Sequence, residues 1–543
     1  MSTDGILTFL LQHSPALIVA VPLLGAFLTP IIGKINDKIR NLFVIIIVLL
    51  TSFFVFLLSS NILSNGSIRT YVFGAASANN PVIRIFFQVD GLNAFMIIIG
   101  AILSIVAVLF SFRYLKEYTG QDKFYTLVLL MIAGMFGMML TGDMFNFFVF
   151  LEITSIASCA LIAFWTSKGE SVYAGLKYIV ISTIGALFIL FAIAILYGQY
   201  NALNMGFLAA SIQYTFLDKV ALVLLISGLA MKAGIVPMHM WMPDAYGRAP
   251  APISILLVGA TQASLYALFR MVFTVYGSHL ADILRHIKFR FFVTIEFDIT
   301  LNGILGVLII ILALFTIIIG VFMALKQSDF KRLIAFAAVA EIGYMLLAIG
   351  AAIITISEID TETGTIILSE VGVNSLKGGL FHIINDALDI GLMFLVAGAI
   401  YYVTKETSLN KLGGLARNMK YTTIFFLIGL FAVAGIPPMN GFASKLLIYE
   451  STYEINPILS IIAIMCSILL LAMFVKVFHS IFLGPKQEKF EKIREVPKSM
   501  LIAMAIISCI IIIFGLFPDI ILQNIIEPAA NALINNGLYI GGI

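Results

Sequence analysis

Residues 229–237 read LAMKAGIVP, and residues 430–438 read LFAVAGIPP. Each stretch places Ala-Gly-Ile followed by proline inside a long apolar segment. Proline within a helix removes one backbone hydrogen bond and obstructs another. In a membrane, such a break is tolerated only where protein or water surrounds it. The two stretches therefore predict two broken helices, interrupted at Pro237 and at Pro437 and Pro438, in matching places of two halves of the chain.

The composition around these breaks is that of a helical membrane protein. The 543 residues are 61% hydrophobic and 11% charged, whereas an ordinary soluble domain has about 25% charged residues. The mean hydropathy is +1.08. These values exclude a soluble enzyme and a disordered chain. The apolar runs are continuous and do not alternate with polar residues, which excludes a porin-type barrel.

No motif for redox, nucleotide or nucleic-acid chemistry is present in the sequence. The net charge is only +3 and no basic tract occurs, so we expect no nucleic-acid partner. Cys159, Cys466 and Cys509 lie in separate apolar runs, a pattern unlike a disulfide framework, a zinc site or an iron–sulfur site. We therefore expect no catalytic residue, metal or cofactor on this chain, and we expect a partner or an ion gradient to supply the energy.

Hydropathy predicts an all-α membrane protein with about fourteen transmembrane helices. The two breaks are 201 residues apart and fall in the seventh and twelfth predicted helices, which are five helices apart. An odd separation gives the two copies opposite membrane orientation, which predicts two inverted five-helix repeats. The expected domains are helices 1–3 (1–124), the first repeat with helices 4–8 (125–275), the second repeat with helices 9–13 (301–482), and helix 14 with a tail (483–543). The predicted helices lie near residues 14–33, 39–60, 92–112, 125–141, 144–167, 172–198, 219–237, 252–275, 301–325, 330–354, 378–404, 421–447, 456–482 and 499–521.

Charge asymmetry predicts the orientation. Of the 32 Lys and Arg residues, 21 lie in or beside loops that follow odd-numbered helices, and 7 in or beside loops that follow even-numbered helices. Cytoplasmic loops carry the excess of Lys and Arg. We therefore expect both termini outside, in the plasma membrane of a prokaryote. Residues 61–91, 276–300 and 355–377 are expected to form ordered extramembrane loops.

Charged residues inside the predicted helices are the candidates for an ion pathway, because each costs at least about 2.5–3.5 kcal/mol in the bilayer core. A carboxylate near a buried lysine controls whether the lysine holds or releases a proton. The competing interpretation is a structural ion pair or a side chain that reaches the interface. Asp386 and Asp389 could also complement the dipole at a helix start. The candidates are Glu152, Lys232, Lys445, Glu341, Asp386, Asp389, His382 and His239.

Three other polar residues are better explained as interfacial. Arg270, Lys476 and His479 lie toward predicted helix ends, where long side chains extend to the headgroups. His239 follows the first break beside Trp241, and a lone His or Trp there is typically an interfacial anchor. None of these residues has metal-ligand spacing.

Several motifs in combination resemble the antiporter-like proton-pumping subunits of respiratory complex I, Mrp cation/proton antiporters and archaeal membrane-bound hydrogenases. The similarity covers about residues 85–520 and is greatest to the Mrp D-subunit branch and its hydrogenase-type relatives. The motifs are VDG at 89–91, GDMFN at 142–146 before Glu152, KAGIVP at 232–237, WMPDA at 241–245, DFKRLIA at 329–335, EIGY at 341–344, and GIPP at 435–438 before Lys445.

The resemblance implies that Glu152 and Lys232 form the switching pair of one half-channel, and that Lys445 serves the other. Two positions depart from the family pattern. Gln262 stands where helix 8 usually has a lysine or histidine, and Ile390 stands where helix 11 usually has a lysine. Either water and nearby acidic groups carry the proton across, or the route is interrupted. An acid-rich axis would also suit sodium, since hard cations prefer oxygen ligands.

The expected function is that of an ion-translocating, antiporter-like subunit that moves protons, with proton/sodium exchange as an alternative, within a multisubunit respiratory or Mrp-type complex. Its expected partners are other membrane subunits, protons or sodium, and lipid. A stand-alone cation/proton antiporter is one alternative, and a structural subunit with an interrupted proton path is another. The sequence does not decide whether the complex is an oxidoreductase, so enzyme membership stays open.

Overall fold

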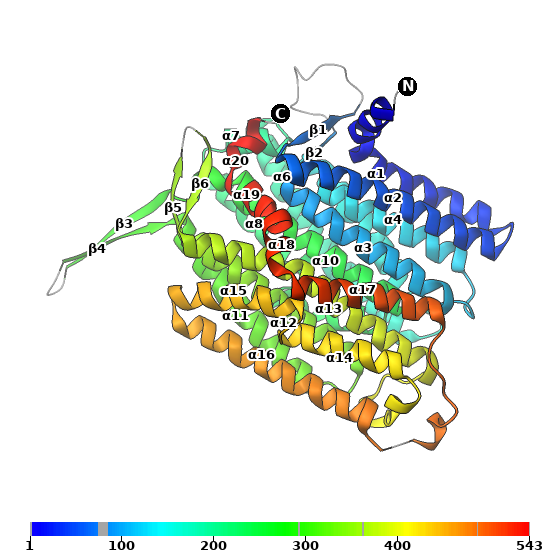
Figure 1. The fold of residues 1–543 in the computed structure, drawn as a ribbon. Coiled ribbons are helices and arrows are strands. Elements are labelled where there is room, and N and C mark those ends of the chain that lie inside the picture. The colour runs from blue at the N-terminus through cyan, green and yellow to red at the C-terminus, as the bar shows by residue number, and fades with distance from the viewer. Residues whose placement is uncertain (1–2, 74–84, 291–293, 361–362, 486, 542–543) are drawn as a thin grey trace.

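The computed structural model describes residues 3–73, 85–290, 294–360, 363–485 and 487–541. Long helices lie side by side in a bundle (Figure 1). The helices of the first half are α1 (Thr3–Gly33), α2 (Asp37–Asn65), α3 (Gly91–Tyr114), α4 (Gln121–Leu140), α5 (Met144–Ile162), α6 (Gly169–Tyr200), α7 (Met205–Ser211), α8 (Phe216–Ala233), α9 (Met242–Arg248) and α10 (Ala251–Arg270). Those of the second half are α11 (Leu301–Leu325), α12 (Phe330–Ile354), α13 (Glu370–Thr404), α14 (Lys420–Ala434), α15 (Asn440–Ile455), α16 (Pro457–Phe478), α17 (Lys498–Leu516), α18 (Pro518–Ile521), α19 (Glu527–Ile534) and α20 (Asn536–Gly541).

Thirteen helical segments among the described residues are long and apolar enough to cross a membrane. One of them combines α8 with α9 across the first break. The fourteenth crossing is divided between α14, which has only 15 residues, and α15. The prediction of an all-α membrane protein with about fourteen transmembrane helices is confirmed.

Both predicted breaks occur, and they are built alike. Helix α8 ends at Ala233 before Gly234, and α14 ends at Ala434 before Gly435. The two glycines have φ values of 73° and 69°, in the left-handed region where a side chain would be strained. The chain then re-enters a helical turn at Met238 after the first break and α15 at Asn440 after the second. Each half of the protein therefore contains a membrane-crossing helix that is interrupted by a short non-helical segment.

Side chains satisfy backbone groups that the breaks release. The indole Nε1 of Trp241 donates to the carbonyl of Met231 at 2.9 Å. The Nζ of Lys445 donates to the carbonyl of Val433 at 2.7 Å. Buried polar backbone groups need such partners in a membrane, where bulk water cannot replace them.

Helices α5 and α12 begin in the same way. Asp143 caps α5 by accepting from the Asn146 amide at 2.6 Å, and Asp329 caps α12 by accepting from the Arg332 amide at 3.1 Å. A side-chain oxygen at this position satisfies one of the free amides of the first turn. The first amide of each helix bonds to the chain that follows the neighbouring helix, Met144 to Leu203 O and Phe330 to Thr407 O. This repeated arrangement relates α5 and α6 to α12 and α13, while the predicted domain boundaries stay a prediction.

The expected extramembrane loops contain antiparallel hairpins. Their strands are β1 (Arg69–Val72) with β2 (Phe86–Val89), β3 (Ile283–Arg290) with β4 (Thr294–Thr300), and β5 (Ile356–Asp360) with β6 (Thr365–Leu368). Residues 74–84 of the 61–91 loop lie outside the described residues. The third loop is shorter than expected, because α13 begins at Glu370 and not near residue 378. Asp386 and Asp389 therefore lie in the middle of a helix, and the interpretation of them as helix-start acids is wrong.

The C-terminal segment folds back over the bundle. Helix α17 ends at Leu516 and not near residue 521, and α18 to α20 continue toward the start of α3 (Figure 1). The amide Nδ2 of Asn536 donates to the carbonyls of Phe273 and Thr274, which belong to a π-turn, Met271–Val275, at the end of α10. A π-turn leaves carbonyls without their usual helical donors, and Asn536 supplies one.

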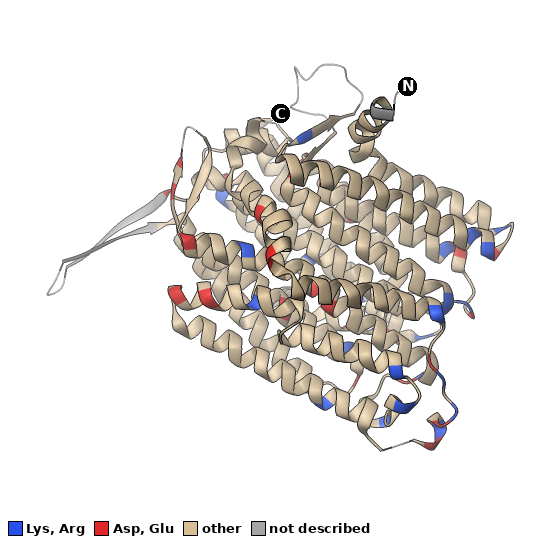
Figure 2. Ribbon diagram, viewed as in Figure 1, with Lys and Arg blue, Asp and Glu red and all other residues tan. Residues whose placement is uncertain are grey.

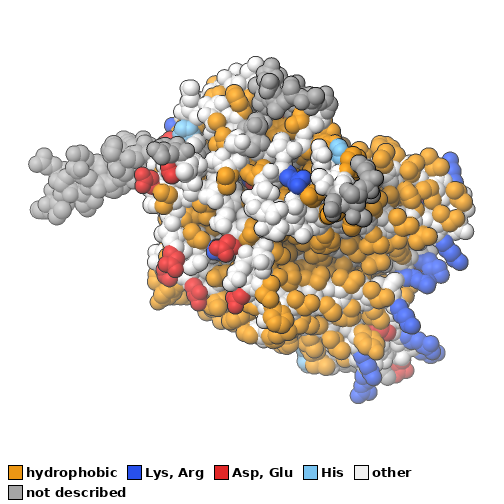
Figure 3. All heavy atoms as spheres, turned by 45° about the horizontal axis from the view of Figure 1, so that its top comes forward, with side chains coloured by type: hydrophobic (Ala, Val, Ile, Leu, Met, Phe, Trp, Pro, Cys, Tyr) orange, Lys and Arg blue, Asp and Glu red, His pale blue; other side chains and the backbone are white. Residues whose placement is uncertain are grey.

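Charge is distributed unevenly along the bundle axis. Figure 2 shows Lys and Arg gathered at one end of the helices, with Asp and Glu more frequent at the other. The flank between the two ends is covered by apolar side chains, as Figure 3 shows for one face. The start of α1 and the end of α20 both lie away from the Lys- and Arg-rich end (Figures 1 and 2).

Candidate functional site

Lys232 occupies the last turn of α8, two residues before the first break. Its Nζ lies 3.5 Å from Oε1 of Glu152 on α5. The same Nζ donates to the hydroxyls of Ser155 and Ser182, each at 2.6 Å. The lysine side chain is 6% exposed and that of Glu152 is 25% exposed. The structure thus brings together Lys232 and Glu152, the first predicted pair. Their ion contact is long, and the two hydrogen bonds from Lys232 to serine hydroxyls are shorter.

Lys445 lies one turn into α15, just after the second break. Its Nζ donates to Oε1 of Glu341 on α12 at 2.9 Å, and both side chains are only 2% exposed. The other carboxylate oxygen of Glu341 lies 2.8 Å from Nε2 of His382 on α13. His382 in turn contacts the hydroxyl of Ser444 through Nδ1 at 3.0 Å. This second centre is a buried Lys–Glu–His triad.

The two centres lie beside the two breaks, but on opposite sides of them, since Lys232 precedes the first break and Lys445 follows the second. Lys232 and Lys445 flank the breaks, and their partners Glu152 and Glu341 lie in α5 and α12, the helices that begin with matching aspartate caps. The sequence motifs pair Lys232 with Glu152 but leave Lys445 without a partner. Matching helix 5 with helix 10, five helices later, would have pointed to Glu341, although the 201-residue offset itself leads from Glu152 to Ile353. The serines around Lys232 were missed, although Ser155 lies three residues after Glu152 and so shares its helix face.

Polar residues on α10 and α13 lie between the two halves. The amide Nε2 of Gln262 donates to Oδ2 of Asp386 at 2.5 Å, and both side chains are buried. Asp389, also buried, lies one turn further along α13. Among the described residues, Oδ1 of Asp386 and of Asp389, Oε1 of Gln262 and Oδ1 of Asn440 have no hydrogen-bond partner. This region therefore offers acceptor oxygens in place of the expected lysines.

A small cavity extends from Lys232 toward α10. Its volume is about 20 Å³, and its lining includes Ser155, Lys232, Thr261 and Ser264. A space of this size holds about one water molecule. Its lining reaches α10 at Thr261, the residue before Gln262, but does not include Gln262 or Asp386.

His239 does not join either centre. It lies in the turn after the first break and is 5% exposed. Neither ring nitrogen has a hydrogen-bond partner among the described residues. The ring of Phe336 lies edge-on to it, at 6.4 Å between centroids. The interpretation of His239 as an interfacial anchor does not fit this burial, and a place in the ion pathway stays a prediction.

Arg270 is also not interfacial, contrary to the sequence interpretation. Its side chain is 1% exposed and contacts both carboxylate oxygens of Asp90 at 2.7 Å. A further contact of 2.9 Å reaches the side-chain oxygen of Asn93. The ring of Tyr539 covers the guanidinium at 4.7 Å. The fixed fork of a guanidinium suits this bidentate contact, so Arg270 is a buried structural cation, whereas Lys476 and His479 are exposed as expected.

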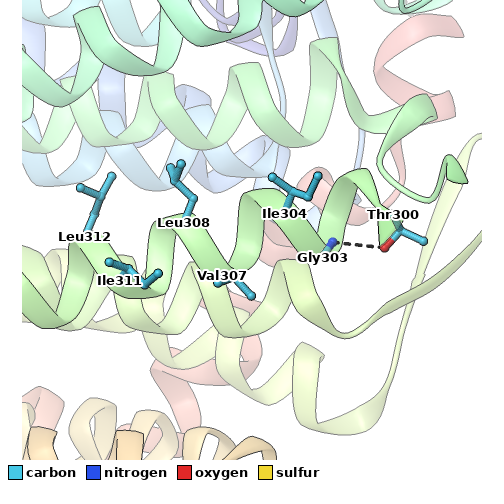
Figure 4. Close-up of a pocket in the computed structure, with 7 residues that line it drawn as sticks. All are labelled: Thr300, Gly303, Ile304, Val307, Leu308, Ile311 and Leu312. Atoms are coloured by element: carbon cyan, nitrogen blue, oxygen red, sulfur yellow. Dashed lines mark hydrogen bonds between the residues drawn. The ribbon is translucent and has the colours of Figure 1, made fainter. Parts of the chain in front are cut away.

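A separate cavity of about 660 Å³ carries no ionisable group in its described lining. It is a shallow groove along α11, lined by Thr300, Gly303, Ile304, Val307, Leu308, Ile311 and Leu312 (Figure 4). Its apolar side chains suit lipid or an apolar neighbour and offer nothing to an ion.

These features define a class of protein: a helical membrane protein with two broken helices, each placing a lysine–glutamate pair inside the bundle, as in transporters with repeated halves. Residues 141–289, 280–363 and 363–471 match the family of NADH:quinone oxidoreductase and Mrp antiporter transmembrane subunits. The matches extend over more than half of the chain, and the protein belongs to this family. The predicted resemblance is confirmed.

Relatives come from more than one branch of the family. The chain is 30% identical to the N subunit of the NADH-quinone oxidoreductase of Desulforudis audaxviator, over 95% of this chain and 98% of that protein. It is 29% identical to the D subunit of a Na(+)/H(+) antiporter of Alkalihalophilus pseudofirmus, over 82% of this chain and 83% of that protein. A chain of the archaeal membrane-bound sulfane sulfur reductase superposes with a TM-score of 0.82 at 27% identity, covering 98% of this chain and 100% of that one. The assignment to the Mrp D-subunit branch stays a prediction.

Proposed function

We propose that this protein is an ion-translocating, antiporter-like subunit that moves protons across the membrane within a multisubunit respiratory or Mrp-type complex. The observation that carries the proposal is the pair of lysine–glutamate centres at the two broken helices. Buried ionisable groups in membrane helices mark ion pathways by default. The names of its relatives, which include a quinone-reducing complex and a sodium/proton antiporter, support the same conclusion.

The contact lengths indicate how the first centre works. Burial favours the neutral form of a lysine, and a nearby carboxylate favours the charged form. At 3.5 Å the Lys232–Glu152 contact is close enough to act but too long for a strong hydrogen bond. If Lys232 and Glu152 moved slightly apart, the lysine would release its proton. If they moved closer, the lysine would take up a proton. Ser155 and Ser182 accept hydrogen bonds from the Lys232 ammonium in the position that the structure shows.

Proton transfer between the halves uses carboxylates and water in place of the two missing lysines. The cavity beside Lys232 accommodates one water molecule and reaches Thr261. The Gln262–Asp386 contact then joins α10 to α13, and α13 also carries His382 of the second centre. The oxygens of Asp386 and Asp389 that lack a partner among the described residues offer acceptor sites on the way. Because the same oxygens suit sodium, proton/sodium exchange is the second candidate.

Partner subunits are inferred from the exposure of Glu152. Its side chain is 25% exposed, and Val149 and Ile156 on the same face of α5 are 38% and 60% exposed. A carboxylate in contact with lipid at this depth costs at least about 2.5–3.5 kcal/mol. A neighbouring membrane subunit over this face removes that cost. The Lys- and Arg-rich end faces the cytoplasm of a prokaryotic cell and the termini face outside.

The test is purification of the native complex, with mass spectrometry of its partners and ion flux in inverted membrane vesicles. Iron–sulfur or nickel partners indicate a redox-driven pump, and small hydrophobic partners without metals indicate a gradient-driven antiporter. An isolated chain that transports alone would overturn the proposed assembly. If a Lys232→Met variant of the complex moved protons and sodium as the wild type does, the chain would be a structural subunit and not an ion-translocating one.

A further inference from the structure

A third cavity, of about 190 Å³, lies at the end of the bundle where basic residues gather (Figure 2). Five chain segments meet there: the end of α3, the α5–α6 connection, the end of α9, the start of α12 and the end of α13. All five belong to the connections that follow odd-numbered transmembrane helices. Its basic lining residues are Lys168, Arg248, Lys331 and Lys405, against the single carboxylate of Glu170.

Most of this positive charge is uncompensated. Arg248 contacts Glu170 at 3.1 Å and Asp329 at 3.5 Å. No carboxylate of the described part of the chain lies within 4.0 Å of the Nζ of the three lysines. Lys168 donates instead to the neutral hydroxyl of Tyr401, at 2.6 Å. The cavity therefore gathers three lysines, none of which forms an ion pair with a carboxylate of the described residues.

Lys331 makes the site more than a group of surface lysines. Its side chain is 3% exposed, and its ammonium donates to the carbonyl of Ala249. An ammonium has three donors, so two remain for another acceptor. A buried cation without a counter-ion is costly, and a bound anion would remove that cost. The DFKR motif at 329–332 thus contributes a buried cation that the ion pathway does not use.

Aromatic residues line the cavity at the expected level of the lipid headgroups, and one of them offers a further hydrogen-bond donor. Trp165 lies in the wall of the cavity, with the Lys168 ammonium 4.4 Å from its ring centroid. The rings of Tyr114, Tyr118 and Tyr401 lie within 6.4 Å of the Trp165 ring. The buried Nε1 of Trp165 has no partner within the described ranges. Tryptophan and tyrosine gather at the headgroup level of membranes.

We propose that Lys168, Lys331 and Lys405 form a binding site for a phosphate-type anion, with the headgroup of an anionic phospholipid as its source. Lysine binds phosphate as a point charge, and basic pockets between transmembrane helices on the cytoplasmic side bind such headgroups. Free phosphate has the same chemistry. The site is separate from both lysine–glutamate centres, so its failure would leave the proposed ion pathway untouched.

The experiment uses the full-length chain purified with its copurifying subunits and stripped of lipid by detergent exchange. The test variant is Lys168→Gln/Lys405→Gln, which changes two exposed lysines at the cavity mouth. The control is Lys420→Gln/Lys498→Gln, with the same charge change on two exposed lysines at the starts of α14 and α17. Phosphatidylglycerol, phosphatidylcholine and inorganic phosphate are added separately. Native mass spectrometry counts bound lipid, and thermal unfolding reports stabilisation.

We expect phosphatidylglycerol, and not phosphatidylcholine, to bind and stabilise the wild type and the control. The test variant should bind it about tenfold or more weakly, since each surface lysine adds several-fold to affinity for anionic lipid. Stabilisation by inorganic phosphate alone, with the same variant dependence, would identify free phosphate as the source. Equal responses of the test and control variants, or no response to either anion, would overturn the site.

Discussion

The amide of Gln262 donates a 2.5 Å hydrogen bond to the carboxylate of Asp386, and this contact joins α10 to α13 inside the bundle. Gln262 is the residue at which the sequence resemblance leads us to expect a lysine or histidine. Asp386 lies four residues before Ile390, the other position that lacks its lysine, on the same helix face. An amide–carboxylate contact thus links Gln262 to a carboxylate that lies one helical turn from Ile390.

Replacement of Asp386 by asparagine tests whether this carboxylate carries protons. The amide of Asp386→Asn has nearly the same shape, so the fold should persist, while proton movement should fall by on the order of 10²-fold, as for loss of a positioned proton-transfer group. Proton uptake by inverted vesicles measures the effect. The control is Glu370→Gln, an exposed acid at the start of the same helix. Undiminished proton uptake in Asp386→Asn would show that this carboxylate does not carry protons. The same comparison can be made with Asp389→Asn.

Lys232→Met should abolish coupled ion movement. Methionine keeps most of the apolar stem but has no ammonium to exchange a proton with Glu152. We expect a loss of at least about 10²-fold in flux with normal assembly. Lys219→Met is the control, because Lys219 is an exposed lysine on the same helix. Equal flux in the two variants would contradict the assignment of the first centre.

The second centre should dominate local stability because it is fully buried. Glu341→Gln leaves Lys445 without its counter-ion, and breaking a buried pair costs about 3–5 kcal/mol. The double variant Glu341→Met/Lys445→Met removes both charges and should recover much of that loss while remaining inactive. Thermal unfolding of the purified complex measures both variants. If the double variant were as unstable as the single one, the uncompensated charge would not be the cause.

Arg270→Met should destabilise the protein without a specific effect on transport. It leaves the 3% exposed carboxylate of Asp90 without its bidentate partner, again at about 3–5 kcal/mol. Flux per correctly assembled complex should stay close to wild type. Arg113→Met, an exposed arginine on α3, should change neither quantity. A transport defect in a fully assembled Arg270→Met complex would place this cation in the pathway.

Gly441→Ala should disturb the second break. An added Cβ would lie 2.1 Å from the carbonyl oxygen of Ala432, so α14 and α15 would have to move apart. Overpacking of this kind costs about 1–3 kcal/mol and should also displace Lys445 from Glu341. Gly198→Ala, where a Cβ meets nothing within 4 Å, serves as the control. Unfolding midpoints and flux of the two variants can be compared directly.

The sequence alone determined the class of protein, the number of crossings and the two breaks. These features depend on local composition: about 20 apolar residues are needed to cross lipid, and proline in a helix interior removes one backbone hydrogen bond and obstructs another. Lys232 with Glu152, and Lys445, could be selected because a charge in an apolar run is costly and therefore rare.

Only the tertiary structure decided which charges meet. Glu341, Lys445 and His382 lie on α12, α15 and α13, up to 104 residues apart, and Asp386 meets Gln262 across 124 residues. Arg270 shows the same limit: its position near a helix end favours the interface, yet Asp90, 180 residues away, holds it inside. The hydropathy pattern shows which charges are costly to bury. The partner that offsets this cost lies on a different helix, and only the packing of the helices brings the two side chains together.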